Sequence, residues 1–431
     1  MTGRLGVLDS MTWYRASIPE IPKFAPLGGD MDVDVAIVGA GFTGLSAAID
    51  LARGGREVAV LEAGPVGWGA SGRTGGQICT GYSPGMEKFV RVLGREGAQR
   101  AFDIAEEAKR LIVERGEKYG FDCDIRWGYL ICANKPSHMS HLEDYLRELE
   151  SFGYTGCRLV PKERLEAEYL GTTVYHGASY DPGAGHLHPL KYVLGLARAA
   201  EEEGAFVHEH TPVTRFEDGS VITLHTPRGR VRCGQLVLAT NAYIDGLYPR
   251  IARRIMPVAS YIVATEPLGA ERARELIRHD EAVADANFVV DYFRLSSDNR
   301  LLFGGRCSYS GWHPRNLAAY MRPRMLRVFP QLEDVQIDFA WGGHIGITYN
   351  RLPDAGVTGR HGNIRHAQGY SGQGVALAGM MGRLIAGDIL GTDDRFELFA
   401  RIPHMPFPGG IFARPAHTLG MLYYRLKDLI G

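Results

Sequence analysis

A glycine-rich turn early in the chain has the spacing that binds a dinucleotide. Gly39, Gly41 and Gly44 form the pattern G-x-G-x-x-G, and Glu62 follows 18 residues after the last glycine. The first glycine permits a tight turn, the second lets backbone N–H groups approach a pyrophosphate, and the third lets a helix pack closely on a strand. An acidic residue at that distance can accept hydrogen bonds from an adenosine ribose. An ordinary strand-to-helix turn is the alternative.

A second glycine-rich segment follows the acidic residue. Residues 64–85 contain eight glycines, which lets a ligand approach the backbone closely. The central part, residues 67–77, reads GWGASGRTGGQ and offers Ser71, Arg73 and Gln77 as polar partners among small residues. Such a segment can line a flat ring system, which favours a dinucleotide larger than NAD. A surface loop without a ligand is the alternative.

Two later segments could close over the same ligand. Residues 235–243, QLVLATNAY, form a buried-strand pattern, after which Ala239 and Thr240 could cover the dinucleotide. Residues 369–375, GYSGQGV, open a helical pattern, and a helix N-terminus offers unpaired N–H groups and partial positive charge. A ring that gains negative charge on reduction would be stabilised there. A plain core strand and a helix entry without a ligand are the alternatives.

Three side chains are candidates for contact with a substrate. Tyr292 and Arg294 alternate along one predicted strand and therefore share a face. Arg294 could grip a carboxylate through two parallel hydrogen bonds, and Tyr292 could cap the pocket; a Tyr/Arg ladder that faces solvent is the alternative. His344, in the stretch WGGHIG, could be catalytic or a structural hydrogen-bond donor. His186 and His188 lack a sensibly spaced third ligand, so we predict no metal site.

The elements that must position these residues alternate between helix and strand. A β-branched strand, a helix ended by glycine and a second strand surround the first glycine turn, which makes a β-turn-α-β unit. Helices are predicted over residues 90–120, 138–152, 188–204 and 371–390. Strands are predicted over residues 33–38, 57–61, 126–133, 159–161, 205–208, 213–216, 235–240, 288–295 and 300–304.

Composition and charge narrow the class of protein. The 431 residues are 45% hydrophobic and 23% charged, which excludes collagen-like and disordered chains despite 55 glycines. With 48 basic and 49 acidic residues the net charge is −1, which argues against a nucleic-acid partner. Six scattered cysteines, no apolar signal-peptide core and no uninterrupted apolar run predict reduced thiols, no membrane span and a cytoplasmic location.

Stretches across nearly the whole chain resemble one superfamily of enzymes. These stretches are WGASGRTGGQ, GHLHPLKY, YFRLSSDNRLLFGGR, WGGHIGITYNRLPDAG and GYSGQGVAL, with WYRASIP before them and FPGGIFARP after them. They are similar to FAD-dependent oxidoreductases of the D-amino-acid oxidase (DAO) superfamily, and most like the group that includes gamma-glutamylputrescine, glycine and sarcosine oxidases. The motifs are specific to the superfamily and much less specific for the substrate.

The resemblance implies a noncovalent FAD that lies extended across the first module. Residues 342–350 contain no cysteine, whereas sarcosine-oxidase-like relatives attach their flavin through a cysteine in that segment. Val213 matches the position whose backbone meets the adenine. The implied FAD-binding residues are Gly39, Gly41, Phe42, Thr43, Gly44, Glu62, Ala63, Gly69, Ala70, Ser71, Arg73, Thr74, Gly75, Gly76, Gln77, Val213, Ala239, Thr240, Gly372, Gln373, Gly374 and Val375.

The implied fold class is α/β (α+β), with a Rossmann-like FAD-binding domain and an interleaved, sheet-based substrate domain. The FAD-binding domain would comprise residues 30–85, 180–245 and 340–395. The substrate domain would comprise residues 86–179 and 246–339. Residues 1–29 and 396–431 would be terminal extensions that pack on the core.

The implied reaction is oxidation of a C–N bond in a small-molecule amine or amino acid. Hydride transfer to flavin N5 would give an imine that hydrolyses to a carbonyl compound, and O2 would reoxidise the flavin with formation of H2O2. Tyr292, Arg294 and His344 would lie near the substrate and the flavin. Residues 301–303 read LLF and lack the lysine that assists reaction with oxygen in sarcosine-oxidase-like relatives. A dehydrogenase that passes electrons to a quinone or carrier protein is therefore the alternative.

Overall fold

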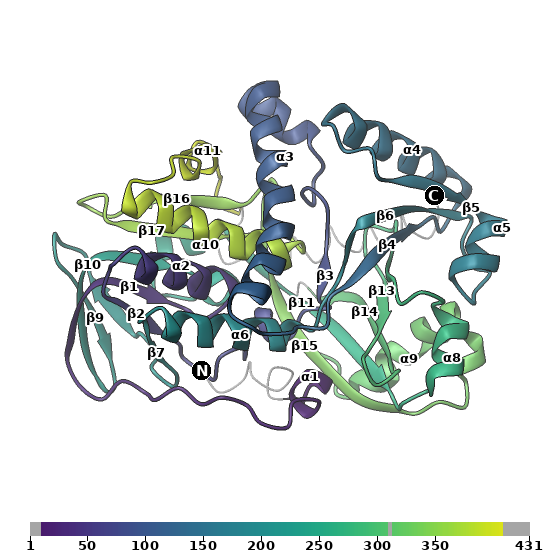
Figure 1. Ribbon diagram of the computed structural model, residues 1–431, viewed down its shortest axis with the longest axis horizontal. Coiled ribbons are helices and arrows are strands. Elements are labelled where there is room, and N and C mark those ends of the chain that lie inside the picture. The colour runs from purple at the N-terminus through teal and green to yellow at the C-terminus, as the bar shows by residue number, and fades with distance from the viewer. Residues whose placement is uncertain (1–9, 309–312, 408–431) are drawn as a thin grey trace.

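The computed structural model describes residues 10–308 and 313–407, which fold around two sheets. Figure 1 shows sheet A and its helices on the left and sheet B on the right. Strands of the two sheets alternate along the chain, so neither sheet is built from one continuous segment. The predicted mixture of helix and strand, with interleaved modules, is present.

Sheet A is mainly parallel, and β1 lies near its centre. Its strands are β1 (Met31–Val38), β2 (Val58–Leu61), β7 (Phe206–His208), β8 (Arg215–Glu217), β9 (Ile222–Thr226), β10 (Gly229–Leu238), β16 (Asp354–Thr358) and β17 (Ile364–Gln368). Their order is β16-β17-β10-β1-β2-β7, and β9 and β8 extend from β10. β1 pairs in parallel with β10 and β2, and residues 35–38 are buried, as expected for a central parallel strand.

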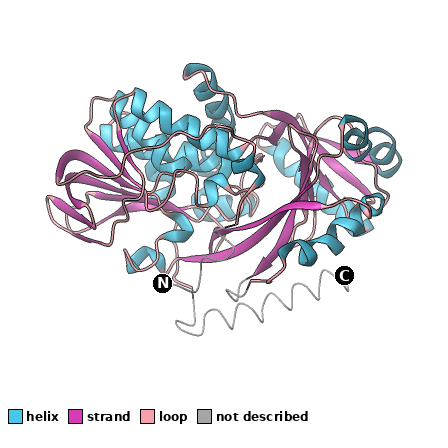
Figure 2. Ribbon diagram, turned by 90° about the horizontal axis from the view of Figure 1, so that it is seen from below, coloured by secondary structure: helices cyan, strands magenta, loops and turns pink. Residues whose placement is uncertain are grey.

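A layer of helices covers one side of sheet A, as Figure 2 shows from below. These helices are α2 (Phe42–Arg53), α3 (Glu87–Lys118), α6 (Pro189–Glu202) and α10 (Gly374–Leu390). α2 and α10 follow the parallel strands β1 and β17, so both begin at the carboxyl edge of the sheet. Thr43 Oγ1 and Tyr370 OH are hydrogen-bonded at 2.7 Å and link the two helix entries.

Sheet B is mostly antiparallel and forms the second module. Its strands are β3 (Gln77–Ile78), β4 (Arg126–Cys132), β5 (Arg158–Pro161), β6 (Gly177–His186), β11 (Ile255–Thr265), β12 (Ala282–Asp285), β13 (Tyr292–Leu295), β14 (Leu301–Ser308) and β15 (Ile337–Thr348). Their order is β15-β11-β14-β13-β12-β4-β6-β3, with β5 paired to β6. Only β4 and β12 pair in parallel among its described strands.

The remaining helices lie mainly around sheet B and at the two ends of the described chain. They are α1 (Trp13–Ala16), α4 (Pro136–Ser151), α5 (Lys162–Arg164), α7 (Pro249–Ala252), α8 (Ala270–Leu276), α9 (Leu317–Val328) and α11 (Phe396–Ala400). α9 packs Met321 and Met325 into a buried cluster with Phe293 and Phe303 of sheet B. Across the described residues, every helix is too short or too polar to span a bilayer.

One continuous apolar core joins the two modules. Leu45 of α2 and Leu384 of α10 belong to the same buried cluster as Ile262 of β11 and Trp341 of β15. Tyr14 of α1 is also fully buried in this cluster. Because both sheets contribute to one close-packed core, the surface where they meet is fixed in shape.

The observed elements match the predicted ones closely, with four corrections. The strand predicted over residues 288–295 is shorter and spans Tyr292–Leu295. The second glycine-rich segment, predicted as a loop, contains the 3-10 turn η1 (Ala70–Gly72) and then β3, which joins sheet B. The helix predicted from residue 371 begins at Gly374, because Ser371 has a φ of 52°. The strand predicted from residue 213 begins at Arg215. The predicted domain division stays a prediction, and its boundaries at 180 and 340 fall inside β6 and β15.

Candidate functional site

The glycine turn after β1 is as tight as its sequence predicts. Gly39 has a φ of 106°, and a Cβ there would lie 2.8 Å from the carbonyl oxygen of Ala239. A Cβ on Gly44 would lie 2.0 Å from the carbonyl oxygen of Gly39. Because neither position accepts a side chain, α2 starts directly over the end of β1 and presents its first N–H groups at the carboxyl edge of sheet A.

Glu62 and Ser71 lie against this turn. Glu62 Oε2 accepts a hydrogen bond from Ala40 N at 2.8 Å, and its Oε1 accepts one from Gly64 N at 3.0 Å. Burial raises the pKa of Glu62, and these backbone donors oppose the rise. Ser71 Oγ accepts a hydrogen bond from Phe42 N at 3.1 Å, at the start of α2. The predicted ribose-binding acid and the predicted pyrophosphate turn are therefore neighbours.

The chain that leaves β7 passes beside Glu62. Glu62 N donates to His208 O at 2.9 Å, and Thr211 N donates to Glu62 O at 2.8 Å. Val213, the predicted adenine contact, follows two residues later and is half-buried, whereas Ala63 is exposed. An adenosine held by Glu62 would thus meet backbone from this segment.

Arg73 fixes the second glycine-rich segment between the two sheets. Its Nε donates to Trp68 O at 2.9 Å, and one terminal nitrogen donates to Gly342 O of β15 at 3.2 Å. Trp341 Nε1 donates in turn to Arg73 O at 3.0 Å. Arg73 therefore holds the loop against sheet B. The other loop residues predicted to touch the cofactor, all buried or half-buried, are Gly69, Ala70, Thr74, Gly75 and Gly76.

Two buried amide atoms near the contact between β3 and α10 have no hydrogen-bond partner among the described residues. We call this place the junction. They are Gln77 Nε2, at the end of the loop, and Gln373 Oε1, just before α10. β3 and α10, which carry or adjoin these residues, are in contact. A Cβ on Gly372 would lie in open space, and Gly374 and Val375 begin α10 without a side-chain cap. A free donor, a free acceptor and an uncapped helix N-terminus fit the polar edge of a flavin ring.

The segment after β10 connects the glycine turn to β15. Ala239 is buried beside the turn, and Thr240 is half-buried where the chain enters the 3-10 turn η3 (Asn241–Tyr243). Asn241 Oδ1 accepts a hydrogen bond from Gly369 N at 2.9 Å. A Cβ on Gly346 would lie 2.2 Å from the same oxygen. Three segments that are distant in sequence thus converge at one place.

Arg294 is buried, and its donors are already used within the protein. Its Nε donates to Gly75 O at 2.7 Å, and one terminal nitrogen donates to Leu295 O at 2.9 Å. The other terminal nitrogen donates to Tyr14 OH at 3.2 Å and to Leu187 O at 3.1 Å. Since a guanidinium has five N–H groups, one remains, and the predicted two-bond grip on a carboxylate is not available in this arrangement. Arg294 holds the loop at Gly75 instead.

Tyr292 lies directly beside the predicted flavin loop. A Cβ on Gly75 would lie 2.7 Å from the Tyr292 ring, and a Cβ on Gly304 would lie 2.1 Å from it. Tyr292 OH and Ser260 Oγ are hydrogen-bonded at 3.3 Å. Burial raises the pKa of Tyr292, so the phenol stays protonated at neutral pH. Ser260 was not among the residues predicted from sequence, because it lies on a different strand and has no local signal.

His344 belongs to a group of aromatic and imidazole rings at the edge of sheet B. Its backbone N donates to Tyr243 OH at 3.3 Å, and the two ring centroids are 5.8 Å apart. The ring of His313 is 6.1 Å from that of His344, and His313 Nδ1 is hydrogen-bonded to Tyr261 OH at 3.0 Å. Tyr243 was likewise not predicted as a site residue, although it ends the stretch QLVLATNAY.

The His-x-His pair serves two separate structural purposes. His186 Nε2 lies 2.9 Å from Asp280 O, and His188 Nδ1 accepts a hydrogen bond from Lys191 N at 3.1 Å, which caps α6. Within residues 10–308 and 313–407, no three or more His, Cys, Asp or Glu side chains form a group that could hold a metal ion.

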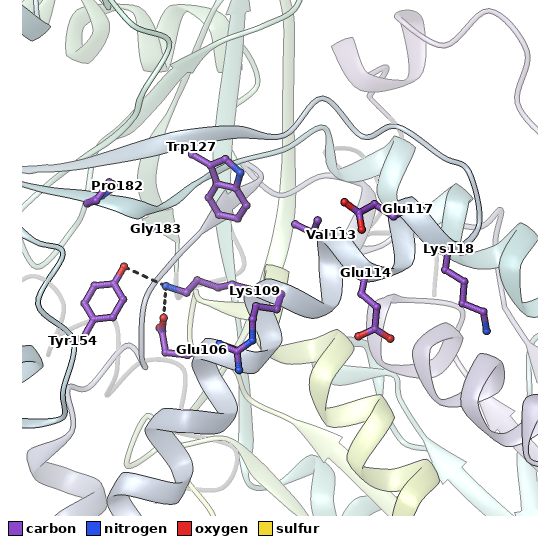
Figure 3. Close-up of a pocket in the computed structure, with 11 residues that line it drawn as sticks. Glu106, Lys109, Val113, Glu114, Glu117, Lys118, Trp127, Tyr154, Pro182 and Gly183 are labelled. Atoms are coloured by element: carbon purple, nitrogen blue, oxygen red, sulfur yellow. Dashed lines mark hydrogen bonds and ion pairs between the residues drawn. The ribbon is translucent and has the colours of Figure 1, made fainter.

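A separate groove of about 970 Å³ runs between α3 and the strands β4 and β6 (Figure 3). Trp127 and Tyr154 line it opposite Lys109, whose Nζ lies 2.8 Å from both Glu106 Oε2 and Thr80 Oγ1. None of the residues that line this groove is a predicted site residue. The groove is therefore distinct from the junction around Gln77 and Gln373.

Comparison with known proteins identifies the family. The family model described as FAD dependent oxidoreductase, DAO, matches residues 34–387. The chain belongs to the DAO family of FAD-dependent oxidoreductases. A protein of Haemophilus influenzae named probable oxidoreductase OrdL is 41% identical, over 94% of each chain. Gamma-glutamylputrescine oxidoreductase of Escherichia coli is 37% identical, over 97% of this chain and 98% of its own.

Solved structures of DAO type share the fold. Glycine oxidase from Geobacillus kaustophilus aligns with a TM-score of 0.73 and 23% identity, over 87% of this chain and 100% of its own. L-proline dehydrogenase from P. horikoshii aligns with a TM-score of 0.73 and 20% identity, over 87% of this chain and 98% of its own. The predicted family, fold class and FAD cofactor are confirmed. The individual FAD contacts remain predictions.

Proposed function

We propose that this DAO-family protein oxidises a C–N bond of an amine or amino acid and uses O2 as the electron acceptor. Two groups of relatives support an amine substrate, since one is named gamma-glutamylputrescine oxidoreductase and others are named glycine oxidase. The relative of higher identity, probable oxidoreductase OrdL, carries no substrate in its name. The proposed substrate class, a gamma-glutamylated polyamine, is supported by the name of the 37% identical Escherichia coli relative.

One observation carries the proposal: the face of sheet B that holds Tyr292 and Ser260 backs directly onto the loop that ends at Gln77. The Tyr292 ring contacts the loop at Gly75, and its hydroxyl reaches Ser260. A flavin ring beside Gln77 and Gln373 would thus have the side chains of Tyr292 and Ser260 over it. A substrate bound to these two side chains would lie next to the reactive edge of the ring.

In such a reaction the side chains of this protein would orient the amine and exclude water. Bound FAD would supply the redox chemistry, because it can accept a hydride, which is a proton together with two electrons. Tyr292 would orient the amine with its hydroxyl, and the rings of Tyr243 and His344 would exclude water. The amine must bind neutral, and burial beside Tyr292 favours the uncharged form, because it penalises a charged ammonium. Residues 301–303 are buried and apolar, which supports the dehydrogenase alternative, since no cation there would assist oxygen.

The test is anaerobic mixing of the purified, flavin-containing protein with a panel of amines, followed by admission of air. We expect at least one polyamine conjugate or amino acid to bleach the flavin absorbance, and air to restore it with formation of H2O2. Bleaching that air does not reverse within seconds would identify the dehydrogenase. A flavin band that no member of the panel bleaches would contradict the proposal.

A further inference from the structure

The groove between α3 and the strands β4 and β6 has an exposed aromatic wall (Figure 3). Trp127 of β4 lines it and is 42% exposed, although an indole is largely apolar. Tyr154 lies at one end, and its ring already faces an ammonium group, because Lys109 Nζ is 4.8 Å from the ring centroid. Val113 of α3 adds an apolar side chain to the floor. Aromatic faces attract cations as well as apolar chains, so these walls suit a ligand that combines the two.

The Tyr154 end of the groove has more negative than positive charge. Lys109 Nζ lies 2.8 Å from Glu106 Oε2 and donates to Thr80 Oγ1 at 2.8 Å. The hydroxyls of Thr80 and Tyr154 donate in turn to Asp181, which is 8% exposed and has no ion-pair partner among the described residues. Glu106 Oε1 is buried and also lacks a hydrogen-bond partner there. One ammonium group thus serves two carboxylates, and one carboxylate oxygen is unused.

The opposite end of the groove has a second carboxylate. Glu117 follows Glu106 by 11 residues of α3, which is about three helical turns, so both side chains lie on one face of the helix. Their Cα atoms are roughly 16 Å apart at 1.5 Å per residue. Glu117 is exposed and forms no ion pair within residues 10–308 and 313–407. Carboxylates therefore lie at both ends of the groove, with Trp127 between them in Figure 3.

The remaining charged side chains do not reverse this balance. Glu114 forms an ion pair with α10 at 2.7 Å, and Lys118 forms one with the end of α6 at 2.8 Å. Arg110 is the cation that lines the groove without an ion pair among the described residues, and it is exposed. Asp181 and Glu117 outnumber it, so the groove attracts cations and repels anions.

We propose that this groove binds a linear aliphatic diammonium or polyammonium ion. One ammonium group would lie beside Glu106 and the other beside Glu117, and the methylene chain would pack against Trp127 and Val113. Such a ligand would contact helix α3 on one side and sheet B on the other, and it would stabilise the folded protein. The site is separate from the junction and does not depend on the proposed amine oxidation.

The test is calorimetric titration of the flavin-containing protein, without oxygen, with 1,8-diaminooctane, 1,4-diaminobutane and the neutral 1,8-octanediol. We expect the long diamine to bind at least about ten times more tightly than the diol, because charged contacts hold both ends. The short diamine should bind more weakly than the long one, because it cannot reach both carboxylates. Equal affinities for the long diamine and the diol, or no binding of the diamine, would overturn the proposal.

Variants of exposed side chains locate the binding. Trp127→Ala should weaken binding of the long diamine about 10-fold, and Glu117→Gln about 3- to 10-fold. Glu114→Gln is the matched control, because that carboxylate lies on the same helix and is already paired with Arg383. Wild-type affinity in both Trp127→Ala and Glu117→Gln, or an equal loss in Glu114→Gln, would overturn the assignment to this groove.

A variant of the flavin region separates this inference from the proposed function. Tyr292→Phe should bind the long diamine as the wild type does, and its Trp127→Ala counterpart should oxidise amines as the wild type does. Binding that Tyr292→Phe weakens and Trp127→Ala leaves unchanged would place the diamine at the flavin and overturn the groove site. Because the titration requires no turnover, a protein that oxidises no amine would still give the predicted binding.

Discussion

Two arginines on neighbouring strands of sheet B have opposite surroundings. Arg294 is 3% exposed and donates four hydrogen bonds to protein oxygens, three of them carbonyls. Arg306 is half-buried and lies on strained backbone, and its buried Nε has no hydrogen-bond partner among the described residues. The first holds the loop at Gly75, and the second is held by stacking on the Tyr320 ring. The contacts that each guanidinium makes, and not the residue type, separate the two arginines.

The largest effect is expected at Arg294. Arg294→Met removes four hydrogen bonds and leaves Gly75 O and Leu187 O buried without donors. We expect a loss of about 3–5 kcal/mol in unfolding free energy and reduced flavin content, because the flavin loop loses its anchor. Thermal unfolding and the ratio of flavin to protein absorbance measure both. Arg306→Met is the control and should change stability by less than about 0.5 kcal/mol; similar losses in both variants would remove the distinction.

The next effect is an acid-dependent loss of stability at His188, which lies in the same buried region as Arg294. Burial, with the charges of Arg294 and Lys191, lowers the pKa of His188 to about 3. Below the unfolded value of about 6.5 only the unfolded chain binds the proton, so stability falls as pH drops from 6.5 toward 3, by about 1.4 kcal/mol per pH unit. His188→Asn keeps a capping side chain without this titration. Its melting temperature should fall less between pH 7 and pH 5 than that of the wild type; an equal fall would contradict the assignment.

A smaller effect is expected at Tyr292. Tyr292→Phe keeps the ring against Gly304 and removes only the hydroxyl that reaches Ser260. We expect kcat/KM for amines to fall about 10-fold, equivalent to about 1.4 kcal/mol of lost hydrogen bonding, with unchanged flavin content. Ser260→Ala serves as the matched variant, since it removes the other hydroxyl of the pair. Unchanged kinetics in both variants would take this pair out of the reaction.

The smallest effect concerns the backbone of Arg306. Arg306→Gly and Arg306→Ala both lack the guanidinium, but only glycine adopts a φ of 49° without strain. Arg306→Gly should therefore be more stable than Arg306→Ala by about 0.5–1 kcal/mol. Denaturant unfolding of the two variants measures this difference. An alanine variant of equal or greater stability would show that this backbone carries no strain.

The glycine turn could be predicted from sequence because its causes are local. A Cβ on Gly44 would meet the carbonyl oxygen of Gly39 within the same short unit, and Gly39 has a φ of 106°, which favours glycine. The contact that excludes a side chain at Gly39 comes from the distant Ala239. Gln77 and Gln373 were also predicted, but the free donor and free acceptor that they bring together depend on the contact between β3 and α10.

The roles of the arginines could not be predicted in this way. Three of the four partners of Arg294 come from distant segments, so alternation along one strand could not show that its donors are used within the protein. Arg306 had one local signal, the preceding pair Gly304 and Gly305, which is typical of a bulge. Whether its charge is neutralised depends on Asp291 and Arg324, which no local pattern relates to it.

A crystal structure of the FAD-containing protein would be the most direct test of the central claim. The claim is that the two sheets hold the flavin between the loop ending at Gln77 and the start of α10. We predict that the polar edge of the isoalloxazine lies within hydrogen-bond distance of Gln77 Nε2 and Gln373 Oε1, with Tyr292 over the ring. A ring bound elsewhere, for example in the groove beside Lys109, or both amides turned away from it, would contradict the account.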